Sequence, residues 1–230
     1  YIEGGWPGAN PTDDKFFKSL PKLKYAKAVA FGMMRKSGKS SHNDPGLNAV
    51  INCGVSSVCL VGKSWDFHVK NALKVSLNEN LDMISDTISF ASKRVDEVLF
   101  DAEHFFDGYK NNPDYSLKSI KRAFDSGAKW IILCDTNGGT LPYELKNILS
   151  DVKEIIPAEN IGVHFHNDTD NATYNSIESI RNGVAQIQGT FNGLGERCGN
   201  ANLINVAANV VLKMGYDCNI KKKIKKLTST

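Results

Sequence analysis

The 230-residue sequence lacks the features that mark several specialised protein classes. It has no apolar run near the ~18 residues of a membrane span, and its longest runs, such as residues 130–134, have the length of a strand. Its 28 basic and 25 acidic residues leave a net charge of only +3, so we expect neither nucleic acid nor a membrane as a partner. Five cysteines occur without a C-x-x-C spacing or a signal-peptide pattern, which indicates reduced, buried thiols in a cytoplasmic protein.

What the sequence does contain is an alternation of short apolar runs and longer amphipathic segments. Strands are expected at residues 1–3, 28–31, 57–61, 97–101, 130–134, 161–165 and 185–190. Helices are expected at residues 13–19, 45–53, 77–94, 117–126, 141–156, 172–182 and 200–214, and glycine or proline follows most of them as a stop signal. This alternation predicts an α/β fold with a parallel sheet.

The polar residues that follow the strands favour a closed (β/α)8 TIM barrel over an open sheet, because barrel strand ends converge on one site. They are Glu3, Glu103, Asp135, Thr136, His164, His166 and Asn192. The chain opens at Tyr1 as if at the end of a strand, so we expect the first βα unit of the barrel to be missing. We expect residues 1–215 to form a catalytic domain that is incomplete at its N-terminus. Residues 216–230 would be a basic linker toward an absent C-terminal region.

Two histidines give the sharpest chemical signal. His164 and His166 stand at the end of the expected strand 161–165, and alternate residues of a strand face the same side. Two imidazoles on one face can bind a single divalent metal ion. The sequence therefore predicts a metal site that takes its further ligands from elsewhere in the chain.

A glycine-rich loop from Phe191 to Asn202 follows the last expected strand. Its three glycines allow a ligand to approach the backbone closely, but their spacing does not match the dinucleotide-binding G-x-G-x-x-G pattern. Asn200 is expected to open the next helix. It would either cap the first turn of that helix or offer its amide oxygen to the metal.

Glu103 and Thr136 follow two other expected strands. Glu103 shares a face with Asp101 and is either a general base or an ordinary surface acid. Thr136 begins a polar, glycine-containing segment that is either a turn or a nest for a substrate carboxylate. Residues 62–64 lack the earlier glycine of a P-loop, so we expect no nucleotide site there.

Together these motifs resemble the Claisen-condensing branch of the metal-dependent DRE-TIM barrel family. That branch includes 2-isopropylmalate, homocitrate and citramalate synthases. The segment His164-Phe165-His166-Asn167-Asp168 and the loop from Asn192 to Asn200 carry the resemblance in combination. Residues 3–11, 62–69 and 100–109 are similar to the citramalate-type subgroup, and the resemblance covers residues 1–215.

The resemblance implies an acyltransferase of isoleucine biosynthesis (class EC 2.3.3) that condenses acetyl-CoA with a 2-oxo acid, with pyruvate favoured. It implies a divalent metal ion, Mg2+, Mn2+ or Zn2+, held by His164 and His166, with Asn200 at or beside it. Glu103 would be the catalytic acid, and Thr136 would hold the substrate carboxylate. The other substrate-binding positions would be Glu3, Gly193, Gly195, Glu196 and Arg197.

One departure weakens the expectation of activity. The first strand of the family carries an Arg-Asp pair that polarises the substrate and binds the metal, and no Arg-Asp dipeptide occurs here. We therefore expect little or no turnover by this chain as it stands. The alternatives are isopropylmalate or homocitrate synthase, a superfamily lyase or aldolase, and a metal-binding module without turnover. Unpaired edges of an incomplete barrel attract pairing, so we also expect a homodimer.

Overall fold

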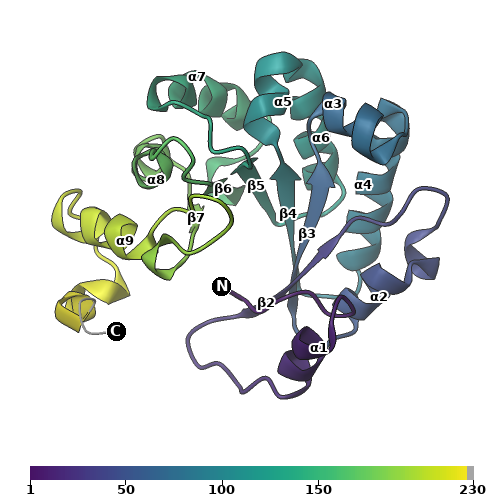
Figure 1. Ribbon diagram of the computed structural model, residues 1–230, viewed down its shortest axis with the longest axis horizontal. Coiled ribbons are helices and arrows are strands. Elements are labelled where there is room, and N and C mark those ends of the chain that lie inside the picture. The colour runs from purple at the N-terminus through teal and green to yellow at the C-terminus, as the bar shows by residue number, and fades with distance from the viewer. Residues whose placement is uncertain (227–230) are drawn as a thin grey trace. The chain divides into compact units, whose positions relative to one another are not determined.

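The computed structural model describes residues 1–226, and within them seven strands follow chain order (Figure 1). They are β1 (Ile2–Glu3), β2 (Ala28–Met33), β3 (Ser57–Lys63), β4 (Glu97–Glu103), β5 (Trp130–Asp135), β6 (Ile161–Phe165) and β7 (Gln186–Gln188). The pairs β1–β2, β2–β3, β3–β4, β4–β5 and β6–β7 are all parallel. The predicted α/β fold with a parallel sheet is confirmed.

Each of the seven expected helical segments contains a helix. These are α1 (Pro11–Lys18), α2 (Pro45–Ile51), α4 (Leu77–Ala91), α6 (Pro113–Asp125), α7 (Pro142–Lys153), α8 (Ala172–Arg181) and α9 (Leu203–Leu212). Helices α1 and α6 begin earlier than expected because proline fits the first helical position, where no N–H is needed. The sequence patterns did not predict α3 (Asp66–His68), the π-helical turn η2 (Val69–Leu73) or α5 (Phe105–Asn111).

Four 3-10 segments complete the described elements: η1 (Ser41–Asn43), η3 (Ala158–Asn160), η4 (Phe191–Gly193) and η5 (Asn219–Lys226). The last lies in the expected basic linker, and its Lys221, Lys222 and Lys223 are exposed to solvent. Residues 227–230 of that linker lie outside the described residues. Among the described helices, none has both the length and the hydrophobicity needed to cross a bilayer.

The chain divides into two compact units, Tyr1–Leu133 and a second one that begins at Cys134. In the first unit β3 and β4 are buried on both faces, as parallel strands usually are. One face carries the cluster of Val29, Cys59 and Leu99. The other face meets a helix, because a Cβ added to Gly32 of β2 would stand 2.6 Å from Val50 of α2.

The second unit contains the end of β5, β6, β7 and the helices α7, α8 and α9. Its core includes Leu145 and Leu149 of α7, together with Val163 and Phe165 of β6. Helix α8 contacts β6 and lies between α7 and α9 in the packing (Figure 1). This packing fixes the strand end at which the two histidines stand.

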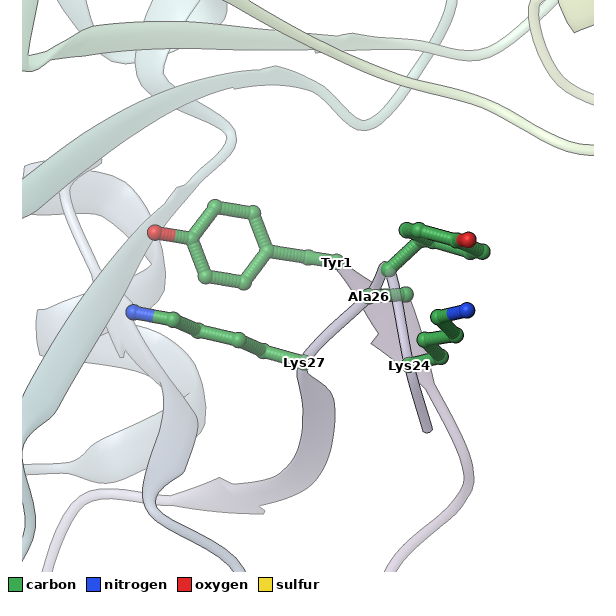
Figure 2. Close-up of a pocket in the computed structure, with 5 residues that line it drawn as sticks. Tyr1, Lys24, Ala26 and Lys27 are labelled. Carbon is green, nitrogen blue, oxygen red and sulfur yellow. The ribbon is translucent and has the colours of Figure 1, made fainter. Parts of the chain in front are cut away.

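A buried carboxylate joins the N-terminal ends of the strands in the first unit. Glu97, the first residue of β4, accepts hydrogen bonds from the Tyr1 hydroxyl (2.7 Å) and the Lys27 ammonium (2.7 Å), and it pairs with Lys129. Figure 2 shows the Tyr1 and Lys27 side chains side by side with their polar ends together, at a cavity of about 450 Å³. This end of a barrel sheet serves stability, whereas the opposite end carries the chemistry.

All five cysteines are free thiols, but the expectation that they are buried is only partly confirmed. Cys59 and Cys134 are buried in strands, whereas Cys53 and Cys218 are half-buried and Cys198 is exposed. Cys198 lies in the glycine-rich loop, between Arg197 and Gly199, which both have positive φ.

Candidate active site

The two histidines come together at the C-terminal end of β6, in the second unit. Their Nε2 atoms are 3.3 Å apart. His164 stands in register with Gln188 of β7, and its Nδ1–H donates to the Gln188 Oε1 at 2.9 Å. That hydrogen bond leaves the Nε2 lone pair of His164 available as a metal ligand.

The separation of the two nitrogens fits joint binding of one ion. Two nitrogens 3.3 Å apart, each about 2.1 Å from one metal, subtend about 105° there, close to a tetrahedral angle. Within residues 1–226, no three His, Cys, Asp or Glu side chains are gathered as a metal cluster. The candidate third ligand in this part of the chain is therefore sought among neutral oxygens.

Asn200 offers such an oxygen. Its backbone forms a bridge with His166, and its buried side-chain Oδ1 accepts no hydrogen bond from the described residues. The expectation that Asn200 caps the next helix is wrong. Asn202 caps α9 instead, by accepting a hydrogen bond from the Ile204 N–H at 3.0 Å. Two imidazole nitrogens and an amide oxygen form a donor set that fits a divalent metal ion.

Gly195 makes room for this amide. A Cβ at position 195 would stand 2.1 Å from the Nδ2 of Asn200. The Asn200 Nδ2 itself donates to the Leu194 carbonyl at 3.1 Å. The neighbouring Gly193 has φ of +70°, which favours glycine, while Glu196 is exposed to solvent. The loop thus positions Asn200 through its backbone.

Arg197 connects three loops of the second unit. Its guanidinium donates two hydrogen bonds to Asp168, at 2.7 and 2.8 Å, and one to the Thr136 carbonyl at 2.7 Å. Its Nη2 also lies 3.3 Å from the Nδ1 of His166. The side chain expected to bind substrate is therefore engaged with the protein itself.

The loop after β5 is built around Asp135. This buried carboxylate accepts hydrogen bonds from the N–H groups of Gly139 (3.3 Å) and Thr140 (3.0 Å). The Asp135 carbonyl accepts from the His166 N–H at 3.3 Å. Thr136, the candidate ligand of the substrate carboxylate, is half-buried at the start of this turn.

The charge state of His166 follows from its surroundings. Burial, the neighbouring His164 and the positive charge of Arg197 lower the pKa of His166 to about 4. The imidazole is therefore neutral at pH 7, as a metal ligand must be.

In the first unit, Glu103 ends β4 and pairs with Lys63, which ends β3 in the same register. Both side chains are largely buried. The ion pair fixes the direction of the Glu103 carboxylate, the predicted catalytic acid. Sequence reasoning missed Lys63, because the pairing depends on a register that connects residues 40 positions apart.

Glu3 of β1 stands on the same face of the sheet, in register with Val29. It keeps contact with solvent, yet the surrounding protein and the charge of Asp101 raise its pKa to about 7. A carboxyl group with this pKa can hold or release a proton near neutrality.

A cluster of rings beside Glu103 was also missed. His104 has φ of +54°, and its Nδ1 lies 3.2 Å from Asp107. The ring of His68 meets His104 edge-on at 4.3 Å and stacks on Trp65 at 4.9 Å. The Trp65 Nε1 and His68 Nδ1 are buried without a hydrogen-bond partner. The closely spaced aromatic residues at 65–68 were the available signal in the sequence.

A cavity of about 460 Å³ opens at the C-terminal ends of β2 and β3. Its lining is mainly apolar and includes Met33, Met34, Leu73 and Met83. Lys36 also lines it and adds a positive charge. Its other charged lining residues are Arg35, Lys63 and Asp44.

Comparison with known proteins adds three findings. The model of the HMGL-like family matches residues 1–230. The chain is 49% identical to (R)-citramalate synthase of Aquifex aeolicus over 230 residues, 99% of this chain and 44% of the relative. It is 30% identical to 2-isopropylmalate synthase of Sulfurisphaera tokodaii, over 96% of this chain and 55% of the relative.

The fold likeness extends to the HMG-CoA lyase of Bacillus subtilis. The TM-score is 0.77 at 19% identity, covering 94% of this chain and 72% of the lyase. The predicted TIM-barrel fold class is confirmed, with the chain as a partial barrel. The chain spans about half the length or less of the two curated relatives.

Proposed function

Because the chain belongs to the HMGL-like family, we propose that it carries the catalytic site of an acyltransferase that condenses acetyl-CoA with pyruvate to give citramalate and CoA. The greater identity to (R)-citramalate synthase than to 2-isopropylmalate synthase supports pyruvate as the 2-oxo acid. The observation that carries the proposal is the convergence of His164 and His166, together with the backbone bridge between His166 and Asn200, whose side-chain oxygen is unpaired. We further propose residues 1–215 as the catalytic domain, in a homodimer.

His164, His166 and Asn200 would hold the divalent metal ion, Mg2+, Mn2+ or Zn2+. When bound, it supplies a Lewis acid that polarises the keto group of the 2-oxo acid. The Gln188 hydrogen bond supports this role, because it holds His164 in the tautomer that a metal ligand requires.

The other residues orient the substrates and move protons. A base would remove a methyl proton from the acetyl thioester, the methyl carbon would bond to the keto carbon, and water would then cleave the thioester to release CoA. Glu103, held by Lys63, would act as the catalytic acid by first accepting a proton and then delivering it to the developing alkoxide. Thr136 would donate to the substrate carboxylate, and Glu3, Gly193, Gly195 and Glu196 would line the substrate site. The cavity at the C-terminal ends of β2 and β3, which Lys36 helps to line, would take the acetyl-CoA arm.

The test is acetyl-CoA-dependent release of CoA by the purified chain. Pyruvate, 2-oxoisovalerate and 2-oxoglutarate are compared, each with Mn2+ and with chelator, after subtraction of the protein's own thiols. Because the chain lacks the Arg-Asp pair, we expect any CoA release to be weak. It should occur with pyruvate, be abolished by chelator and by His164→Ala, and be unchanged by replacing the exposed His42 with Ala. Zn2+ or Mn2+ binding without CoA release from any acid would favour a metal-binding module, and release with 2-oxoisovalerate alone would refute the pyruvate assignment.

A further inference from the structure

We propose that Asn80 binds an amide N–H of the acetyl-CoA arm, the one nearest the thioester, and so makes the site selective for thioesters that carry an amide. This inference deepens the proposed function and rests on its placing of that arm in the cavity at the C-terminal ends of β2 and β3. Asn80 then acts as a binding residue and takes no part in proton transfer.

Asn80 is a buried polar side chain in the wall of this cavity. It lies on α4, is only 2% exposed, and lines the cavity together with Met83, one turn further along the same helix. Most of the other side chains in the wall are apolar, among them Leu47, Val61 and Leu73. An uncharged amide in an apolar wall is the kind of polar group that fixes the orientation of a ligand.

The hydrogen bonds of the Asn80 amide determine which of its atoms remains for a ligand. Its Nδ2 donates to the Lys63 carbonyl at 2.9 Å and to the Tyr115 hydroxyl at 2.8 Å. A carbonyl oxygen can only accept, so the atom that faces Lys63 is the nitrogen. The Tyr115 hydroxyl donates its own hydrogen to the Leu77 carbonyl at 3.4 Å. Both amide hydrogens are thus used, and no residue within 1–226 donates to the Asn80 Oδ1. Asn80 can offer a ligand an acceptor only.

An acceptor in this position selects its ligand by a penalty. A purely apolar chain in the cavity would remove water from the Asn80 Oδ1 without replacing the hydrogen bond, and a buried unpaired acceptor lowers affinity. A chain with an N–H at the same point replaces that bond. The arm of acetyl-CoA carries two secondary amides, whereas an acetyl thioester of a plain alkyl thiol has no donor. The cavity therefore favours the amide-bearing arm.

The peptide unit between Lys63 and Ser64 connects Asn80 to the proposed catalytic acid. Its carbonyl accepts from Asn80, and its N–H donates to the Glu103 carbonyl at 3.3 Å. The Lys63 side chain lines the cavity and also pairs with the Glu103 carboxylate. The acetyl group lies beside Glu103 in the proposed reaction, and the first amide nitrogen of the arm follows the sulfur after two carbons. Asn80 therefore meets the amide nearest the thioester.

The first test changes the ligand and leaves the protein native. Two acetyl-CoA analogues carry an ester oxygen in place of one amide N–H, at the amide nearest the thioester or at the distant one. Binding is measured by calorimetry without a 2-oxo acid. A buried acceptor that loses its partner costs on the order of 10-fold in affinity, so we expect the near analogue to bind about 10-fold more weakly than acetyl-CoA. The distant analogue should bind like acetyl-CoA. Equal binding of the near analogue and acetyl-CoA, or a loss with the distant analogue alone, would overturn the proposal.

The second test removes the acceptor. Asn80→Ala should bind acetyl-CoA and the near analogue equally. Met83→Ala is the matched control, because Met83 lines the same cavity from the same helix. It should weaken both ligands by one factor and keep their native ratio. An Asn80→Ala variant that still prefers acetyl-CoA by the native factor would refute the role of Asn80. The ligand comparison on the native chain decides the proposal even where Asn80→Ala does not fold.

Failure of this inference is distinguishable from failure of the proposed function. Binding of acetyl-CoA with no difference between it and the near analogue would refute the role of Asn80 and leave the proposed condensation standing. No binding of acetyl-CoA by the native chain would overturn the placing of the arm and the role of Asn80 together.

Discussion

Replacing Glu97 with Gln should destabilise the fold in a pH-dependent manner. Glu97 is 5% exposed, and its carboxylate meets two ammonium groups, Lys27 and Lys129, and the Tyr1 hydroxyl. Burial alone would raise its pKa, but the hydrogen bonds from Lys129, Lys27 and Tyr1 lower it from 4.5 to about 2. Glutamine keeps the size of the side chain and removes the charge.

The magnitude follows from this shift. A difference of about 2.5 pKa units corresponds to about 3 kcal/mol in the free energy of unfolding. Both lysines are about half exposed, and solvent screening reduces their contribution. We therefore expect Glu97→Gln to cost about 2 kcal/mol at pH 7, or about 4–8 °C in Tm.

The pH dependence of the stabilisation by Glu97 has a definite direction. The folded pKa lies below the unfolded one, so the stabilisation is complete above pH 4.5 and is lost as the pH falls toward about 2. Urea unfolding followed by tryptophan fluorescence at pH 7, 5 and 3 measures it, with exposed Glu159→Gln as the control. The native chain and Glu97→Gln should converge at low pH. A difference that stays constant from pH 7 to pH 3 would refute the reasoning.

Two glycines give further predictions. Gly195→Ala should weaken Zn2+ binding by about 10-fold or more, because its methyl group would stand 2.1 Å from the Asn200 amide. The control in the same calorimetric titration is Gly139→Ala, whose added methyl group has nothing within 4 Å. Equal Zn2+ affinities of the two variants would contradict the role of Asn200. Gly32→Ala should cost about 1–3 kcal/mol in urea unfolding through overpacking against Val50, and the double variant with Val50→Ala should recover part of the loss. If the double variant recovered none of the lost stability, the strain of Gly32→Ala would not come from contact with Val50.

The sequence predicted the architecture because the fold depends on local patterns. The alternation of strand and helix, and the glycine or proline after helices, placed all seven strands and seven of the helices. Helix α5 and the turn at 66–73 escaped because they are short insertions after strands, without a hydrophobic period of their own.

The sequence predicted the site residues that share one strand end. It missed the residues whose contacts depend on how neighbouring strands pair. The two histidines share a strand end, so their convergence follows from the two-residue period of a strand. The partners Lys63 and Gln188 come from other strands, and their roles depend on register. Asn200 shows the same limit, since a helix start and a strand-like bridge to His166 cannot be distinguished from its local sequence.

The register between β6 and β7 has a consequence for transferring this chemistry to other proteins. His164 and Gln188 are opposite each other in the ladder, so the backbone pairing itself selects which ring nitrogen faces outward. A slip of one residue would bring Ile187 or Gly189 opposite the ring, and neither side chain can accept a hydrogen bond. A design that copies the histidines onto another sheet must therefore copy the neighbouring strand and its alignment as well.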